Sequence, residues 1–166
     1  LSTNYRSPAE VFDLAAQVIS RSFPQADLPA AVRRTGIEPE LLVAPPDQMA
    51  ETVATAVARL LGRVAGTVGL VTPEFWSEAL LRALAERSLD ANRVVVMDPI
   101  TVKGLEYDAV VVADPDRIVA ESSGRERTLY VCLTRPTQRL VTVDVGQPGA
   151  WRPAAAGPGG GAGLPL

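Results

Sequence analysis

The sequence predicts an α/β domain with a mostly parallel sheet and helices on both of its faces. Short apolar runs of β-forming residues alternate with amphipathic helical runs along most of the chain, which is typical of strand-helix-strand units. Two of the predicted strands, at 94–97 and 109–113, are continuous in apolar residues. Such runs are expected where helices cover both faces of a parallel sheet.

The composition fits a single domain and excludes several kinds of chemistry. At 166 residues, 47% of them hydrophobic and 21% charged, the chain can bury one sizeable core. Its apolar runs are far shorter than the roughly 20 residues of a membrane-spanning helix, so none is expected. The chain has no histidine, which removes Ser-His and Cys-His catalysis and histidine metal ligation.

Net charge and cysteine content indicate which partners and which cellular compartment to expect. The formal net charge is −3 and the pI is about 5.0, which argues against a wide basic face for nucleic acid but permits a local contact. Cys132 is the single cysteine, so no internal disulfide is expected, and a reducing, cytoplasmic location is predicted. The first residue is Leu1 rather than Met, so we expect a piece of a longer protein.

The first half of the chain contains three predicted helices. Ser7-Pro8-Ala9-Glu10 has the pattern of a capping box, and Thr72-Pro73-Glu74 offers a threonine cap followed by a proline. The predicted elements are, in order, a helix at 8–21, a strand at 41–44, a helix at 48–63, a strand at 67–71 and a helix from Pro73 to about Arg87.

The second half continues the alternation and ends in a different composition. After the strands at 94–97 and 109–113, a second capping box, Ser123-Gly124-Arg125-Glu126, should open a helix that runs to about Arg135. Pro136 should stop this helix before a strand at 140–145. The ordered domain is therefore predicted over 1–145. Because Gly, Pro and Ala dominate its end, the stretch 146–166 is predicted to be a flexible tail.

Three clusters of polar residues stand where predicted strands and helices meet. They are Asn4-Tyr5-Arg6-Ser7, Lys103-Gly104-Leu105-Glu106-Tyr107-Asp108 and Leu133-Thr134-Arg135-Pro136. Taken singly, each has an ordinary explanation as a solvated or ion-paired surface group. Ligands of parallel α/β sheets bind beyond the carboxyl ends of the strands, and arginine forks match phosphate oxygens. The clusters are therefore candidates for converging on one phosphate-bearing ligand there.

The order and spacing of these clusters resemble the C-terminal motor half of superfamily one helicases, the family of UvrD, Rep and PcrA. Asn-Tyr-Arg-Ser is similar to the fourth helicase motif, Lys-Gly-Leu-Glu-Tyr-Asp to the fifth, and Leu-Tyr-Val-Cys-Leu-Thr-Arg to the sixth. The resemblance implies a RecA-like three-layer sandwich over 1–145. The short interval between the fourth and fifth motifs most resembles HelD, the RNA-polymerase-associated relative.

The resemblance also implies roles for individual residues at an ATP site. Arg6 and Arg135 would reach the γ-phosphate as catalytic arginines, because a guanidinium can stabilise the charge that develops during phosphoryl transfer. Tyr5 would stack on adenine. Glu106 would accept a hydrogen bond from the ribose.

The resemblance also implies a nucleotide-binding loop in this chain and a second half of the ATP site on another domain. Lys103 and Gly104 would complete the nucleotide contacts, with Lys103 orienting the loop. The chain has no Gly-x-x-x-x-Gly-Lys-Ser/Thr phosphate loop. An N-terminal P-loop motor domain of the parent protein is therefore the implied partner. It would hold most of the Mg²⁺ ligands, so the isolated chain is expected to be inactive.

Two further partners and two rival functions stay open. The parent either acts on single-stranded DNA or remodels RNA polymerase, and Ile100, which stands where the helicases usually carry a histidine, weakens the DNA reading. The alternative function is a non-catalytic interaction module of an RNA-polymerase-binding, HelD-like protein. An independent small-molecule enzyme is less favoured, because the chain offers no evident nucleophile and base.

Overall fold

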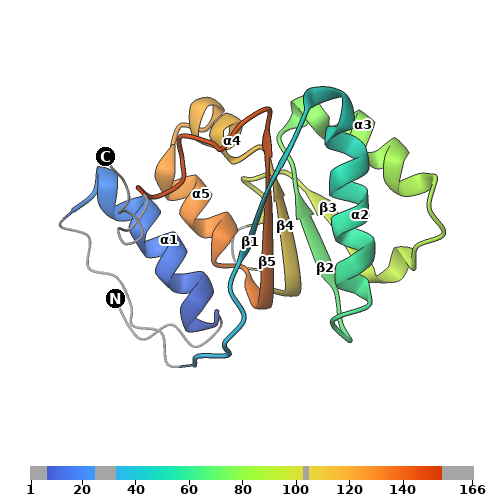
Figure 1. The fold of residues 1–166 in the computed structure, drawn as a ribbon, viewed down its shortest axis with the longest axis horizontal. Coiled ribbons are helices and arrows are strands. Elements are labelled where there is room, and N and C mark those ends of the chain that lie inside the picture. The colour runs from blue at the N-terminus through green and yellow to red at the C-terminus, as the bar shows by residue number, and fades with distance from the viewer. Residues whose placement is uncertain (1–6, 25–32, 103–104, 155–166) are drawn as a thin grey trace, which may run out of the picture.

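The computed structural model describes residues 7–24, 33–102 and 105–154, which form one sheet between two layers of helices (Figure 1). Within these residues the sheet has five strands in the order β1-β5-β4-β2-β3, and every neighbouring pair is parallel. The strands are β1 Glu40–Ala44, β2 Val68–Val71, β3 Val94–Met97, β4 Tyr107–Ala113 and β5 Pro136–Val145. The predicted parallel α/β architecture is confirmed.

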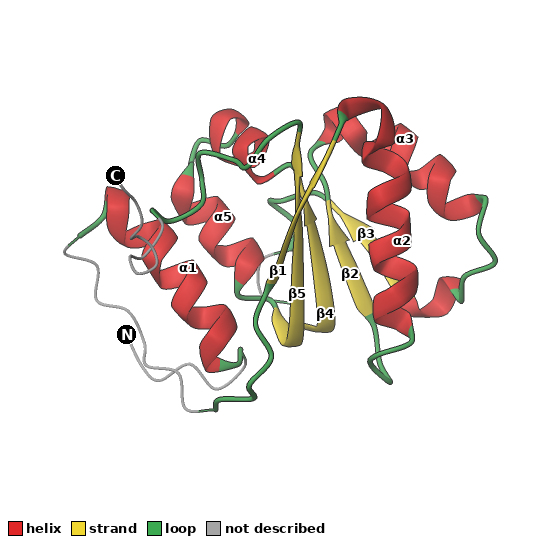
Figure 2. Ribbon diagram, in the orientation of Figure 1, coloured by secondary structure: helices red, strands yellow, loops and turns green. Residues whose placement is uncertain are grey.

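Helices cover both faces of this sheet (Figure 2). They are α1 Ala9–Ser22, α2 Met49–Leu61, α3 Glu74–Ala85, α4 Pro115–Glu121 and α5 Glu126–Leu133, with short 3₁₀ turns at Pro46–Gln48 and Ala91–Arg93. The helices α2 and α3 lie on one face, and α1, α4 and α5 lie on the other. None of the helices in the described part of the chain has the length and apolar character needed to cross a membrane.

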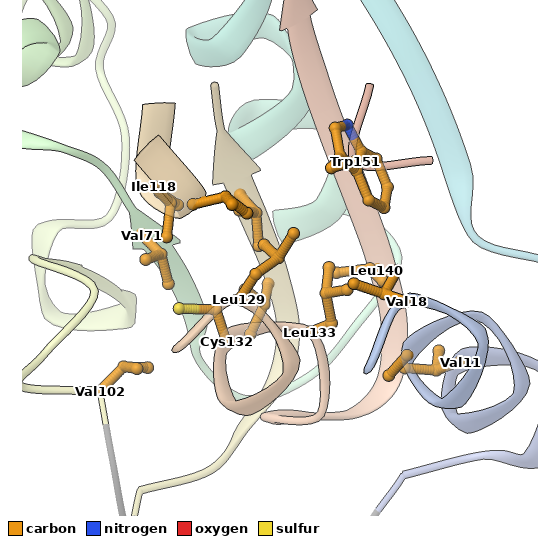
Figure 3. Packing of buried hydrophobic residues seen from close by; sticks show 14 of the residues in the cluster. Val11, Val18, Val71, Val102, Ile118, Leu129, Cys132, Leu133, Leu140 and Trp151 are labelled. Carbon is orange, nitrogen blue, oxygen red and sulfur yellow. The ribbon is translucent and has the colours of Figure 1, made fainter. Parts of the chain in front are cut away.

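The two faces of the sheet bury separate hydrophobic clusters. In β4, Val110 and Val112 belong to the cluster under α1 and α5, shown in Figure 3, whereas Val111 belongs to the cluster under α2 and α3. Successive side chains of a strand point to opposite faces, so β4 must be apolar throughout 109–113 to fill both clusters. This requirement explains the continuous apolar runs in the sequence.

The predicted helix caps are wrong, although the helices themselves form. Ser7 Oγ donates to the Thr134 carbonyl instead of capping α1, and the Glu10 carboxylate accepts hydrogen bonds from residues 35 and 36. The Thr72 hydroxyl donates to the Pro73 carbonyl, and α5 likewise has no side-chain cap. At α1 tertiary partners compete successfully with the local cap, whereas the Thr72 hydroxyl finds a local carbonyl instead.

The region around α5 differs from the prediction in two boundaries and in one additional helix. The helix ends at Leu133, and β5 begins at Pro136, four positions earlier than expected. A proline is tolerated as the first residue of a strand because its missing N–H need not serve the ladder. The short helix α4, Pro115–Glu121, was not predicted; it follows Asp114, whose φ of 54° is left-handed.

The residues directly after β5 are packed, so the predicted tail starts too early. Trp151 is 2% exposed, and its indole N–H donates to Asp144 Oδ1 at 2.7 Å. The backbone N–H groups of Ala150 and Trp151 donate to Asp116, and Arg21 of α1 donates to the Ala150 carbonyl. We call residues 146–152 the C-terminal strap. Residues 155–166, the rest of the predicted tail, lie outside the described residues.

Candidate functional site

The described members of the candidate site lie where strands β4 and β5 begin. Glu106 and Arg135 directly precede these strands, and the Tyr107 N–H donates to the Arg135 carbonyl at 3.2 Å. We call this row of strand beginnings the amino edge and the opposite row the carboxyl edge. The expectation of a site beyond the carboxyl ends is therefore wrong for these residues. The connection after β3 crosses back over the sheet before β4 starts, and α5 returns in the same way before β5.

Arg135 is half-buried and is held by the backbone at the amino edge. Its Nε donates to the Val131 carbonyl at 3.0 Å and its Nη1 to the Leu105 carbonyl at 3.1 Å. The carbonyls of the last helical turn have no intrahelical partner, so the guanidinium caps α5 through Val131. Through Leu105 it also ties the end of the fifth-motif loop to the start of β5. Its Nη2 also donates to the Thr134 hydroxyl at 3.4 Å.

The sixth-motif cluster contacts both of the other clusters. Its Arg135 donates to Leu105 of the fifth-motif cluster, as described above, and its Thr134 contacts the fourth-motif cluster. Ser7 Oγ donates to the Thr134 carbonyl at 2.8 Å, across 127 positions of sequence. The contact places the end of the fourth-motif cluster beside the sixth. Glu106 is exposed at the same edge. The described parts of the three clusters therefore lie close together, and their binding of one ligand stays a prediction; Tyr5, Arg6, Lys103 and Gly104 lie outside the described residues.

The loop between β3 and β4 is fixed by its own turn and by one buried anchor. Asp98 Oδ1 accepts from the N–H groups of Ile100 and Thr101 at 2.8 and 3.0 Å. Val102 is fully buried, while Ile100 is 64% exposed. The Cys132 Sγ of α5 lies 3.8 Å from the Pro99 carbonyl oxygen. The loop therefore presents Ile100 to solvent from a rigid base.

Cys132 does not provide a nucleophile. Burial raises the pKa of the Cys132 thiol to about 12, against a smaller opposing effect of the nearby Arg135 charge. A thiol with that pKa stays protonated at neutral pH, and the thiolate is the reactive form. Among the described residues, no group of three or more His, Cys, Asp or Glu side chains is placed to hold a metal ion.

A second polar and aromatic cluster, missed by the sequence reading, occupies the carboxyl edge. Asp114, after β4, accepts from Trp76 Nε1 at 2.7 Å and from Arg117 Nε at 3.0 Å. The Arg117 guanidinium lies 3.9 Å from the centre of the Phe75 ring, and Phe75 is 63% exposed. Adjacent aromatic residues cannot both face the core from one helix, which was the available signal. We call Phe75, Trp76, Asp114 and Arg117 the aromatic platform.

The fold is that of a helicase C-terminal domain. The crystal structure of the C-terminal domain of a possible DNA helicase from Lactobacillus plantarum WCFS1 matches with a TM-score of 0.66, covering 90% of this chain and 92% of that one at 23% identity. The arterivirus nonstructural protein 10 helicase matches with a TM-score of 0.45 and 20% identity, over 70% of this chain and 31% of that one. The curated protein sequences give no match.

A sequence family also matches part of the chain. Residues 93–143 match the model of the UvrD-like helicase C-terminal domain. This segment runs from the start of β3 into β5 and includes the fifth- and sixth-motif clusters with Glu106 and Arg135. The match supports the resemblance to UvrD-like helicases at the fifth and sixth motifs, whereas the cluster at 4–7 lies outside the matched segment. It gives no preference for HelD among their relatives.

Proposed function

We propose that this chain is the second motor domain of a UvrD-like, superfamily one ATPase and supplies one half of an ATP site. The observation that carries the proposal is the convergence at the amino edge. Ser7 contacts Thr134, and Arg135 contacts Leu105, so all three motif clusters meet within hydrogen-bonding distance. The family match over 93–143 and the helicase-domain fold support the same function.

In this function Arg6 and Arg135 bind the γ-phosphate of ATP held by the partner motor domain. The Arg135 guanidinium now donates to backbone carbonyls, and phosphate oxygens carry more negative charge than these carbonyls do. Exchange of acceptors would therefore favour the phosphate. A guanidinium placed there stabilises the charge that spreads over the γ-phosphate oxygens in the transition state.

The other predicted contacts complete the nucleotide site. Tyr5 stacks on adenine, Glu106 accepts a hydrogen bond from the ribose, and Lys103 with Gly104 forms the adjoining loop. Mg²⁺ is held mainly by the N-terminal P-loop domain, which is the principal partner. The isolated chain then lacks ATP turnover. The proposal includes a cytoplasmic location. The alternative function is a non-catalytic, HelD-like module bound to RNA polymerase.

Replacing Arg135 in the two-domain parent protein tests the function. Arg135→Ala should leave nucleotide binding largely intact and lower ATP turnover by about a thousandfold, the scale of an arginine finger. Arg127→Ala is the matched control, because Arg127 lies near the other end of α5 and stacks on Phe23. Turnover and nucleotide binding are measured on the same preparations. Unchanged turnover in Arg135→Ala, or an equal loss in the control, would refute the role.

A nucleic-acid contact is favoured by one further observation, the aromatic platform. Phe75 is exposed and held rigidly by Arg117, and exposed aromatic rings with adjacent cations bind the bases of single strands. If single-stranded DNA is the partner, Phe75→Ala should lower its affinity about tenfold or more. Leu81→Ala, an exposed apolar change in the same helix, is the control. Stimulation of the ATPase by RNA polymerase and not by DNA would favour the HelD-like alternative.

A further inference from the structure

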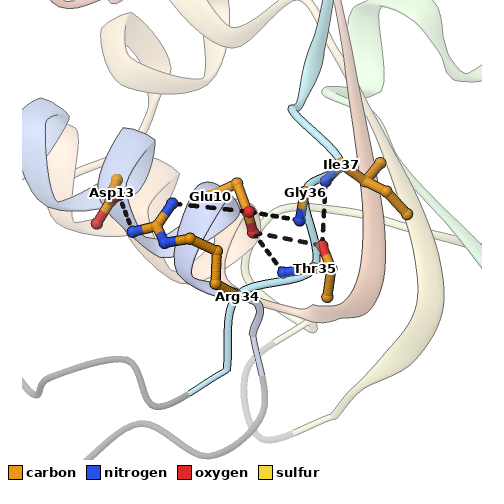
Figure 4. A network of polar contacts seen from close by, with 6 residues as sticks. All are labelled: Glu10, Asp13, Arg34, Thr35, Gly36 and Ile37. Atoms are coloured by element: carbon orange, nitrogen blue, oxygen red, sulfur yellow. Dashed lines mark hydrogen bonds and ion pairs between the residues drawn. The ribbon is translucent and has the colours of Figure 1, made fainter.

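A short segment, Arg33 to Gly36, is bound to the first turn of α1 by a buried carboxylate (Figure 4). Glu10 accepts from the Thr35 N–H at 3.1 Å, the Gly36 N–H at 2.6 Å and the Thr35 hydroxyl at 3.3 Å. Gly36 has a φ of 81°, a left-handed conformation that glycine adopts without strain. The turn therefore aims consecutive backbone donors at one side chain.

The same segment also reaches the start of β5. Arg33 Nη2 donates to the Thr137 carbonyl at 2.8 Å, and the Arg33 carbonyl accepts from the Ala9 N–H. The Ser7 to Thr134 hydrogen bond makes a second connection between the start of α1 and the start of β5. We call this circuit, from α1 through 33–36 to β5 and back, the α1–β5 ring. Arg135 lies on its path, between Thr134 and Thr137.

Glu10 is the buried, charged residue of the α1–β5 ring. Its side chain is 2% exposed, whereas Arg34, 3.6 Å away, is 62% exposed. Burial alone would raise the pKa of the Glu10 carboxyl, but the backbone donors of Thr35 and Gly36, with its own N–H and the Arg34 charge, bring it to about 2. The group is therefore ionised at neutral pH, and its hydrogen bonds are of the stronger, charge-assisted kind.

The docking of α1 itself does not depend on this carboxylate. Val11, Ala15 and Val18 are at most 1% exposed and lie in the cluster shared with α5. These residues hold the body of the helix on the sheet. What Glu10 adds is a link between the first turn of α1 and residues 35 and 36.

We propose that Glu10 is a positioning residue for Arg135. This inference rests on the proposed function, in which Arg135 binds the γ-phosphate of ATP. Through the α1–β5 ring it sets the first turn of α1 relative to Thr134 and Arg135. Stabilisation of a transition state depends on placement to within about 1 Å, whereas ground-state binding of ATP is less demanding. Loss of this link therefore affects turnover more than binding.

The test uses Glu10→Gln in the two-domain parent, because glutamine keeps the volume and removes the charge. We expect kcat to fall about tenfold, the lower range for displaced catalytic groups, with the KM for ATP changed less than about twofold. Asp13→Asn is the matched control, since Asp13 lies on the same helix and pairs with Arg34 but does not bind residues 35 and 36. A rise in KM without a fall in kcat, or an equal fall in the control, would overturn the proposal.

A double variant separates positioning from a general loss of folded protein. If Glu10 acts through the arginine site, Glu10→Gln should have little further effect on kcat in an Arg135→Ala background. A purely structural role would lower both backgrounds by the same factor and so contradicts the proposal. If Arg135→Ala alone leaves turnover unchanged, the proposed function fails. If that variant is slow and Glu10→Gln is as fast as wild type, only the present inference fails.

Hydrogen exchange gives a readout on the isolated domain that does not depend on ATP. Glu10→Gln should raise amide exchange at Thr35 and Gly36, and exchange over Val11–Val18 should stay as in wild type. Loss of protection along the whole helix would show that Glu10 holds α1 down rather than adjusting its first turn. That outcome would also overturn the proposal.

Discussion

The two edges of the sheet differ in which charged side chains lie beside the ends of the helices, and the direction of the helices accounts for the difference. At the amino edge, where α2, α3 and α5 end, Arg93 donates to the Leu61 and Val64 carbonyls and Arg135 donates to the Val131 carbonyl. At the carboxyl edge, Asp114 and Asp144 lie after β4 and near the end of β5. Helix C-termini attract cations and helix N-termini attract anions.

This difference separates the two candidate surfaces by chemistry. Arg93 and Arg135 each donate to backbone carbonyls at the amino edge, and a guanidinium fork there is suited to a phosphate delivered by another domain. The acids of the carboxyl edge are already paired, Asp114 with Arg117 and Asp144 with Arg152. What that edge offers instead is the exposed Phe75 ring. The proposed nucleotide contact and the proposed aromatic contact therefore lie at opposite edges.

The largest effect is expected for a lysine substitution at Arg135. This variant tests whether the amino edge needs the arginine fork or only a positive charge. Arg135→Lys in the parent protein should recover little of the turnover lost in Arg135→Ala, because an ammonium cannot hold a phosphate with two parallel hydrogen bonds. We expect a loss of about a hundredfold or more. Single-turnover ATP hydrolysis measures it. Near wild-type turnover with lysine would reduce the amino edge to a simple electrostatic surface.

The next prediction concerns the stability of the carboxyl edge. Trp151→Ala in the isolated domain should cost about 3–5 kcal/mol, because it empties a buried aromatic site and leaves Asp144 short of a donor. Phe75→Ala at the same edge removes an exposed ring and should change stability by less than about 1 kcal/mol. Urea denaturation compares the two variants. Equal losses would mean that the platform contributes to folding and is not a reserved contact surface.

The smallest prediction concerns acid stability at the amino edge. The pKa of Glu10 is lowered to about 2 in the folded chain, so its contribution is present above its ordinary value of 4.5 and is lost as the pH falls toward 2. The melting temperature of wild type should therefore exceed that of Glu10→Gln at pH 6, and the gap should narrow between pH 4.5 and pH 2. Thermal melts across this range measure the gap. A constant gap would show that volume or hydrogen bonding, and not charge, carries the effect.

The layered fold was predictable because its signals are local or periodic. The apolar run of β4 and the amphipathic runs of α1 and α2 report burial residue by residue, without knowledge of their partners. The helix caps failed for the opposite reason. Ser7 and Glu10 have good local roles in a capping box, yet each finds a stronger partner that is distant in sequence, at Thr134 and at Gly36.

The sequence predicted which described motif residues lie close together, but not where on the sheet they lie. The convergence of Ser7, Leu105 and Arg135 follows the order of the motifs, which sequence can carry. Their position at the amino edge depends on which way the loop after β3 crosses the sheet, and no single motif encodes that direction. Trp151 was missed because the glycines and prolines around it suggested disorder, whereas its ring is fixed by Asp144, seven positions earlier.

β5 joins these two edges as one continuous strand. Its ten residues span roughly 30 Å at about 3.3 Å per residue, from Pro136 beside Arg135 to Val145 beside the C-terminal strap. It pairs with β4 over most of its length, with a register shift between the pairs Tyr107–Pro136 and Ala109–Arg139, and with β1 only from Val141 to Val145. Within the described residues, the half of β5 that follows Arg135 is therefore open along one side, whereas the half that contains Asp144 is held on both.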